Sequence, residues 1–171
     1  MGAEELEREI EEHIKEPFDR KVAGTMAALA AVLAIVSVLG HMANTEEIVQ
    51  QQKASDQWAF YQAKSIRRYE SEIARDVLAA AKAPKADEYE KNFKRYEKET
   101  DEIQKQAKEF EAESHVKGQQ SLRYEYAEVF LEVAIVLASI AILTKLPAIW
   151  FVSIAGGLMG LITAATALVI K

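Results

Sequence analysis

The sequence contains no cysteine and few helix-breaking residues: seven glycines and three prolines among 171 residues. Without cysteine, the chain has no disulfide, no thiolate metal ligand and no cysteine nucleophile. Histidine is also scarce, with three residues. The sequence has no Gly-rich phosphate loop, no His-Glu-x-x-His pair and no nucleophile elbow. We therefore expect no enzyme activity, no catalytic residue, no cofactor and no metal.

The chain also has no excess of basic residues. The chain has 21 Lys and Arg against 27 Asp and Glu, a net charge of -6, and residues 1–21 alone carry -4. Because nucleic acids bind basic patches, we expect no nucleic-acid partner.

A third absence concerns the first half of the chain. Between Gly40 and Pro84 there is no Gly or Pro, so nothing local ends a helix for 43 residues. This stretch continues the apolar run 22–43, which as a helix is roughly 33 Å long and matches a bilayer core of about 30 Å. We expect one membrane helix that continues into water. The alternative is a new helix capped at the membrane surface by Asn44 or Thr45.

Two further apolar runs, residues 127–144 and 148–170, are predicted to span the membrane, separated by a turn at Lys145-Leu146-Pro147. The third span carries small residues four apart, a pattern that favours close helix packing. These are Gly156, Gly160 and Ala164. Aromatic residues near the span ends are expected at the membrane interfaces. They are Tyr124, Tyr126, Trp150 and Phe151.

The polar segment 44–126 is predicted to form an extramembrane antiparallel helical hairpin with its tip near Pro84, and Gly118 is expected to interrupt the returning arm. One heptad frame runs through Ile48, Gln52, Ser55, Ala59, Gln62, Ile66, Tyr69, Ile73 and Ala80. A second runs through Tyr89, Phe93, Tyr96, Thr100, Ile103, Ala107, Phe110 and Ser114. Since two helices bury little by themselves, neighbouring subunits are expected to cover the rest, which predicts a homo-oligomer.

Residues 1–21 are predicted to form an acidic amphipathic helix with an apolar stripe and a kink or stop at Pro17. The stripe consists of Leu6, Ile10, Ile14 and Phe18. This helix is expected either to pack on its own oligomer or to dock a protein partner.

These elements predict an all-α integral membrane protein with three transmembrane helices. Arg20, Lys21 and Lys145 lie beside spans on one side, against Arg123 and Lys171 on the other. This bias favours a cytoplasmic N-terminus and a hairpin on the far side of the membrane.

Acidic residues near the second span form the first candidate site. Glu125, Glu128 and Glu132 share one helix face, and His41 on the first span is expected to be their partner. The interpretations are an interhelical hydrogen bond at the membrane edge or, after oligomerisation, an acidic lining of a cation path.

The second candidate site lies in the run 54–66, ASDQWAFYQAKSI. It has more hydrogen-bonding side chains than a plain coiled coil needs, and we interpret it as a subunit interface, with a ligand or ion vestibule as the alternative. The residues are Gln52, Ser55, Asp56, Trp58, Tyr61, Gln62 and Lys64.

The same run, with Asn44, Gln51, Glu12-His13 and Glu16-Pro17 before it, resembles the bacterial membrane-protein family catalogued as domain of unknown function four-three-three-seven. The resemblance implies a bacterial membrane protein and implies no activity. With the three spans and the charge bias, we expect a multi-pass protein of the bacterial inner membrane whose hairpin lies in the periplasm. We expect a structural or scaffolding assembly embedded in membrane lipid. The alternative is an oligomeric ion channel lined by the acidic residues of the second span.

Overall fold

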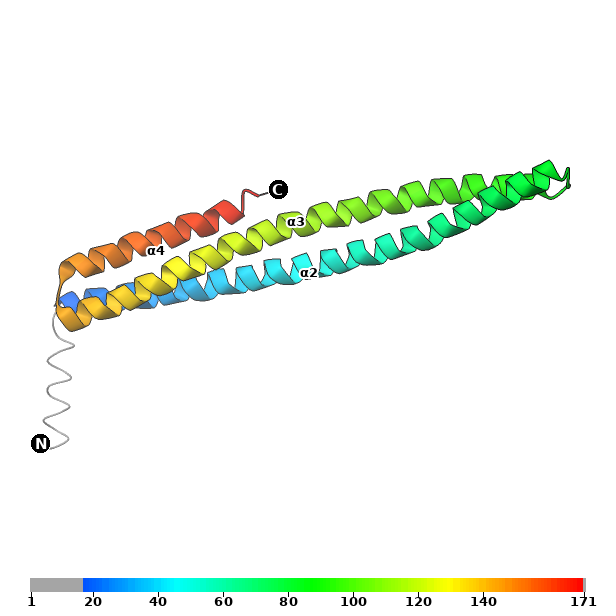
Figure 1. Cartoon of the computed structure of the whole chain (residues 1–171). Helices are drawn as coiled ribbons and strands as arrows, with labels where there is room; N and C mark the ends of the chain where they lie inside the picture. Colours follow the sequence, from blue (N-terminus) through cyan, green and yellow to red (C-terminus); the bar gives the residue numbers. More distant parts are fainter. Residues whose placement is uncertain (1–16, 171) are drawn as a thin grey trace, which may run out of the picture. The chain divides into compact units, whose positions relative to one another are not determined.

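The structure, a computed structural model, describes residues 17–170 as an all-α chain of three helices (Figure 1). Helix α2 covers Pro17–Ala80, α3 covers Ala86–Thr144 and α4 covers Pro147–Ala167. Each contains a segment long and apolar enough to cross a membrane. The all-α class and the three apolar helices are therefore confirmed. The amphipathic helix predicted at the N-terminus lies mostly outside the described residues, as does Lys171.

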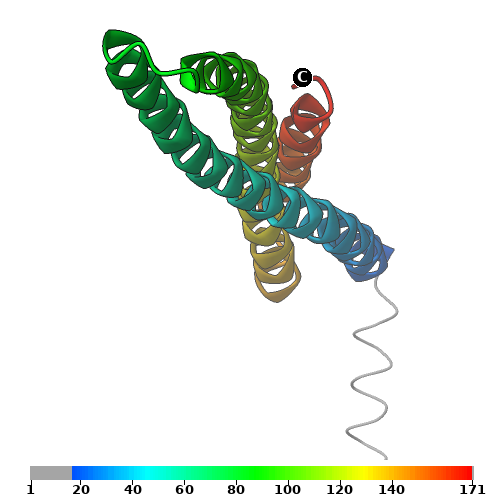
Figure 2. The same cartoon turned by 90° about the vertical axis from the view of Figure 1, so that its right-hand side faces the viewer.

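Both long helices continue through the points where sequence suggested a break (Figure 2). Asn44 and Thr45 lie inside α2, so the alternative of a new helix capped there is wrong. Gly118 lies inside α3, so the predicted interruption is also wrong. A single helical glycine costs only about 1 kcal/mol relative to alanine, which the 59-residue helix tolerates.

The connections between helices are short. Residues 81–85 join α2 to α3, with Lys82 in a left-handed conformation at φ 51°. Lys145, at φ 55°, begins the turn into α4, and Pro147 is the first helical residue, where its fixed φ is favourable. Helix α4 ends at Ala167, three residues before the predicted end of the third span at residue 170.

The chain divides into two compact units, which within the described residues are 17–44 with 118–170, and 45–117. The first unit has a core built largely from small side chains. In the part of α2 that belongs to this unit, buried apolar residues recur every seven positions. In α3 the buried residues are three or four positions apart. These residues are Val22, Leu29, Val36 and Ala43 of α2, and Ala127, Leu131, Ala134, Ala138 and Ala141 of α3.

Helix α4 packs in the first unit through its small residues. A Cβ added at Gly160 would lie 2.9 Å from Leu131 Cγ and 3.1 Å from the Ala127 carbonyl oxygen. Gly156 similarly faces Ala134, and Ala164 is buried. The three residues predicted to favour close packing therefore all lie at or beside the contact with α3.

Two predicted interfacial aromatics have partners inside the first unit. Tyr124 is buried in the core, with its Cβ 3.0 Å from the position of a Cβ added at Gly40. Trp150 donates a 3.2 Å hydrogen bond to Thr25 Oγ1 and makes an edge contact with Phe18. Both are packing residues, and only Tyr126 and Phe151 of the predicted group are exposed.

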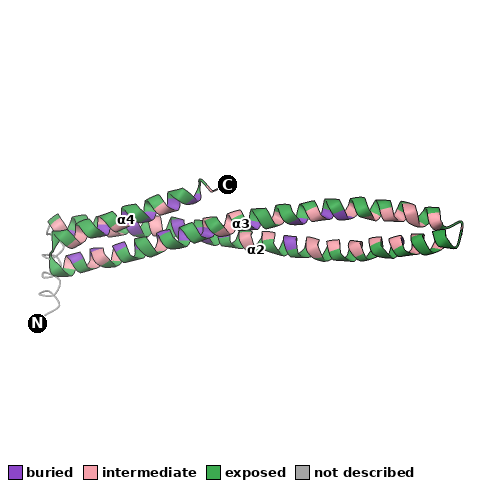
Figure 3. Ribbon diagram, turned by 45° about the horizontal axis from the view of Figure 1, so that its top comes forward, coloured by how far each residue is buried: buried purple, intermediate pink, exposed green. Residues whose placement is uncertain are grey.

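In the second unit, α2 and α3 face each other along one stripe of each helix. All eight residues of the frame predicted for α3, from Tyr89 to Ser114, are buried or half-buried, as expected for positions that face α2. All nine residues of the frame predicted for α2, from Ile48 to Ala80, are exposed, so that frame is wrong (Figure 3). The α2 positions that are buried or half-buried recur on the opposite face of the helix, at Gln50, Ala54, Gln57, Tyr61, Lys64, Arg68, Ser71, Arg75 and Leu78.

Candidate functional site

A polar pocket of ≈ 180 Å³ lies between α2 and α3 in the first unit. Helix α2 contributes residues 37–44 and α3 contributes residues 121–128. The lining residues are Ser37, Gly40, His41, Asn44, Ser121, Glu125 and Glu128. The structure therefore brings His41 together with two of the three predicted glutamates.

The pocket follows from helix spacing and from one glycine. On α3, Ser121, Glu125 and Glu128 are four and three residues apart, so they share a face. On α2, Gly40 lets the helices approach, because an added Cβ would lie 3.0 Å from Tyr124 Cβ and 3.8 Å from Glu128 Oε1. Helix α2 and the two carboxylates of α3 line the space on either side.

Chemically, the pocket offers carboxylate, hydroxyl and amide oxygens, which are ligands suited to hard cations or to water. Within residues 17–170, however, no three His, Cys, Asp or Glu side chains are grouped so that they could hold a metal ion. The pocket is thus a polar contact between two helices.

Glu132 does not line this pocket. It is exposed, one helical turn beyond Glu128 toward the apolar end of α3. The predicted four-residue cluster therefore divides: Glu125, Glu128 and His41 meet, whereas Glu132 points out of the single chain.

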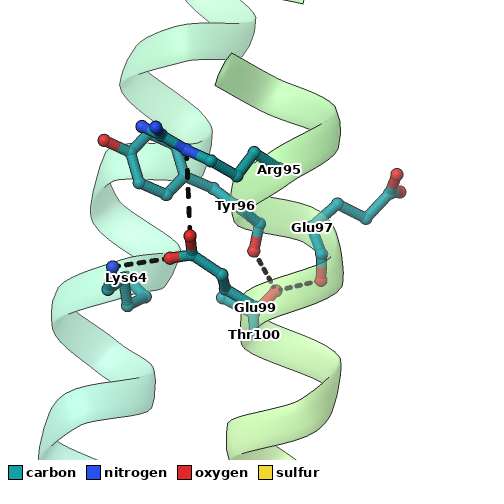
Figure 4. Close-up of polar contacts among 6 residues, drawn as sticks. All are labelled: Lys64, Arg95, Tyr96, Glu97, Glu99 and Thr100. Carbon is teal, nitrogen blue, oxygen red and sulfur yellow. Dashed lines mark hydrogen bonds and ion pairs between the residues drawn. The ribbon is translucent and has the colours of Figure 1, made fainter. Parts of the chain in front are cut away.

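The second candidate group divides as well. Trp58 Nε1 donates a 2.8 Å hydrogen bond to Glu111 Oε1 of α3, and Tyr61 makes an edge contact with Trp58. Lys64 Nζ donates a 2.5 Å hydrogen bond to Glu99 Oε2 (Figure 4). The polar partners of Trp58 and Lys64 are thus in their own chain.

The remaining members of this group are exposed on α2. Gln52 Nε2 donates a 3.0 Å hydrogen bond to Asp56 Oδ1 one turn along the same helix. Ser55 and Gln62 are also exposed. These four side chains are exposed in the single chain, whereas Trp58 and Lys64 join α2 to α3.

Ion pairs between the arms and within α3 lower two carboxyl pKa values in this unit. The hydrogen bond from Lys64 holds the pKa of Glu99 below its usual range. Lys94 and then Arg75 do the same to the pKa of Glu90, and Arg75 lies 5.0 Å from the Phe93 ring centroid. Both carboxylates are ionised at neutral pH and favour the paired arms.

A family model matches residues 18–170, nearly the whole chain. The chain belongs to the family described as a domain of unknown function (DUF4337). The family suspected from the sequence is confirmed. No curated protein matches the chain, and neither does any solved structure.

In this DUF4337 chain, sequence reasoning missed the polar stripe of α2 that faces α3. Buried atoms of that unit without a hydrogen-bond partner among the described residues are Gln50 Oε1, Gln57 Oε1, Ser65 Oγ and Arg68 Nε. Hydrophobic periodicity cannot reveal a stripe in which Gln, Lys and Arg outnumber large apolar residues. A search for opposite charges could have found it. In two paired antiparallel helices, facing residues have nearly equal sums of residue numbers, as Lys64 with Glu99 and Arg75 with Glu90 do.

Proposed function

We propose that this protein is a homo-oligomeric membrane scaffold. The apolar parts of α2 and α3, together with α4, cross the membrane, and residues 45–117 form an extramembrane antiparallel helical hairpin. The hairpin holds a fixed arrangement of helices in water, and the function is mechanical or organisational.

Membrane insertion is supported by the surface of the first unit. Large apolar side chains there are exposed on all three helices, where water would be an unfavourable neighbour and lipid a favourable one. Examples are Ile35, Val38 and Met42 of α2, Val129, Val133 and Val136 of α3, and Val152, Leu158 and Ile162 of α4.

The observation that carries the scaffold proposal is the continuity of α2 and α3. Each helix passes from an apolar, membrane-length segment into a charged segment without a loop. Catalytic and ligand sites are commonly built on loops held by a scaffold, and the only connections among residues 17–170 are the short turns at 81–85 and 145–146. Long unbroken helices are suited to holding other parts of an assembly at set positions.

Orientation is supported by one contact in the first unit. Lys145 Nζ lies 2.5 Å from Asp19 Oδ2, which places the turn between α3 and α4 beside the segment that carries Arg20 and Lys21. Three basic residues therefore gather at one end of the spans. We infer that this end faces the cytoplasm of a bacterium and that the hairpin is periplasmic.

Cysteine labelling in intact cells tests this arrangement. The native chain has no cysteine, so Lys85→Cys in the turn and Lys15→Cys near the N-terminus each introduce a single thiol. A membrane-impermeant maleimide should label Lys85→Cys in intact cells and Lys15→Cys only after lysis. The reverse pattern would contradict the orientation, and labelling of both would show that the N-terminus and the hairpin share one side.

A second candidate function is a cation path, and the polar pocket is the observation that favours it. Glu125 and Glu128 line a polar pocket at the end of an apolar segment, where repetition around an oligomer axis would make an acidic ring. Flux measurements in liposomes distinguish the two functions, because only the path requires the carboxylate charge.

A further inference from the structure

Helix α2 presents two opposite stripes between residues 45 and 80. The stripe that faces α3 contains charged residues such as Lys64, Arg68 and Arg75. The stripe that faces away becomes apolar toward the turn, at Ile66, Tyr69, Ile73 and Val77, which are 59%, 54%, 65% and 62% exposed. The helix thus turns its polar side to its own partner and its apolar side outward.

This distribution is the reverse of the one that a two-helix hairpin in water would favour. An amphipathic helix places its apolar stripe against a partner and its charges in solvent. The four apolar side chains are three, four and four residues apart, so they form a nearly straight line along the helix. The outward stripe therefore has the geometry of a helix contact whose second half is missing from the single chain.

Within residues 45–117, no other segment covers this stripe. Helix α3 already occupies the opposite face of α2 in this unit. The stripe is therefore open to a helix of another molecule.

A second copy of the chain could place either α3 or α2 against this stripe. The outer face of α3 is charged, with the Lys94, Lys98 and Lys105 side chains 70%, 81% and 79% exposed. Packing it on Ile66 and Ile73 would remove these lysines from water together with the glutamates four residues away on α3 that pair with them, and apolar side chains offer no hydrogen bond in exchange. The outward stripe of α2 is the matching apolar surface. Copies inserted in one membrane share an orientation, so equivalent stripes lie at the same height and run parallel.

We propose that the outward stripe, Ile66 with Tyr69, Ile73 and Val77, pairs with the same stripe of a second copy in a parallel α2–α2 contact. This inference rests on the proposed scaffold function, which supplies the shared orientation and the watery location. The contact is isologous, because the same patch is used on both copies, and it closes at two chains. The pair of hairpins then forms a four-helix element, with two parallel α2 helices inside and two α3 helices outside, each α3 antiparallel to its own α2.

Single-cysteine crosslinking of the full chain in proteoliposomes tests the contact. Ile73→Cys places a thiol on the stripe, and Lys91→Cys places one on the exposed face of α3 at a nearby height, since Arg75 pairs with Glu90. Under mild oxidation, Ile73→Cys should form disulfide-linked dimer on the order of tenfold faster than Lys91→Cys, because a held contact gives thiols a high effective concentration. Equal rates for the two variants would overturn the proposal.

A second variant separates this proposal from the oligomer itself. Ile66→Glu with Ile73→Glu adds charge to side chains that are exposed in one chain, so the fold of the monomer should persist and its helical circular dichroism should be unchanged. Native mass spectrometry should then show the stoichiometry reduced relative to wild type. Unchanged stoichiometry, with no crosslink at Ile73→Cys, would overturn the stripe contact and leave the scaffold oligomer standing. A monomeric wild-type protein would overturn both.

Discussion

Lys64 of α2 donates a 2.5 Å hydrogen bond to Glu99 of α3 across 35 positions of the chain (Figure 4). Both side chains are partly shielded, at 23% and 33% exposure, and Arg95 adds a longer contact to the same carboxylate. This pair lies midway along the 45–117 unit and links the register of one arm to that of the other. Removing this pair by mutation therefore tests directly how the arms are paired.

A double-mutant cycle of Lys64→Met and Glu99→Gln should give a coupling energy of about 1 kcal/mol, the upper part of the range for partly exposed ion pairs. The measurement is chemical or thermal unfolding of the detergent-solubilised chain followed by circular dichroism. Lys98→Met with Glu102→Gln is the matched control, since that pair lies 3.9 Å apart on one helix and does not join the arms. A coupling no larger than that of the control would contradict the pairing of Lys64 with Glu99.

Acid should weaken the paired arms. The folded-state pKa values of Glu99 and Glu90 lie below the ordinary 4.5, so their stabilising contribution is fully present above that pH. It is lost as pH falls through the lowered values, because protonation removes the charges that hold Lys64 and Arg75 of α2 against α3. The thermal midpoint should therefore fall more steeply below pH 4.5 in the wild type than in Glu99→Gln.

Glu97→Gln supplies the control for this pH profile, because the Glu97 carboxylate points away from Lys64 (Figure 4). This variant should retain the wild-type acid dependence. If Glu99→Gln and Glu97→Gln change the profile equally, the acid dependence does not come from the cross-helix pair.

Gly160→Ala should destabilise the contact of α4 with α3. The added methyl group would lie 3.1 Å from the backbone oxygen of Ala127 and 2.9 Å from Leu131 Cγ, and the backbone cannot move aside easily. Overpacking of this kind typically costs about 1–3 kcal/mol. Gly24→Ala is the control, since nothing lies within 4 Å of its added Cβ and alanine favours a helix. The thermal midpoint should fall for Gly160→Ala alone, and equal stability of the two variants would contradict the close packing.

Glu132 should act in assembly. It is exposed in the single chain near the apolar end of α3, where an ionised carboxylate needs water, a headgroup or a neighbouring subunit. Glu132→Gln keeps a hydrogen-bonding group and should leave the oligomer intact. Glu132→Leu should lower the thermal stability of the oligomer, and neither variant should change cation flux in liposomes.

The same flux assay decides between scaffold and path. Glu128→Gln keeps the shape of the polar pocket and removes one charge, so it should also leave flux at the wild-type level. A cation current that falls equally in Glu132→Gln and Glu132→Leu, with the assembly unchanged, would support the acidic path and refute the structural role.

The sequence predicted the features that depend on apolar length and on strong helix breakers. The three spans are recognisable because their apolar runs match the bilayer, and the frame of α3 was recognisable because Phe93, Ile103 and Phe110 are bulky and face α2. The frame of α2 was misplaced for the same reason. Its most apolar residues are Ile48, Ile66 and Ile73. Periodicity assigned them to the contact with α3, in which the structure instead places Lys64 and Arg75.

The candidate site was predictable only in part. Helix spacing put Glu125, Glu128 and Glu132 near one face, but it could not show that the pocket ends at Glu128, because that depends on the closeness of α2 at Gly40. The partners of Trp58 and Lys64 are likewise set by the register between two helices 35 to 53 positions apart in sequence. Register of this kind is a property of the packed pair and is not encoded in the periodicity of either helix.

A protein that holds its helices in a fixed arrangement as a homo-oligomer should keep its subunits together in solution. Native mass spectrometry of the full chain released from mild detergent measures this. We expect one dominant species at an integral multiple of the 19.1 kDa chain, unchanged across protein concentrations. A monomer at every concentration would contradict it.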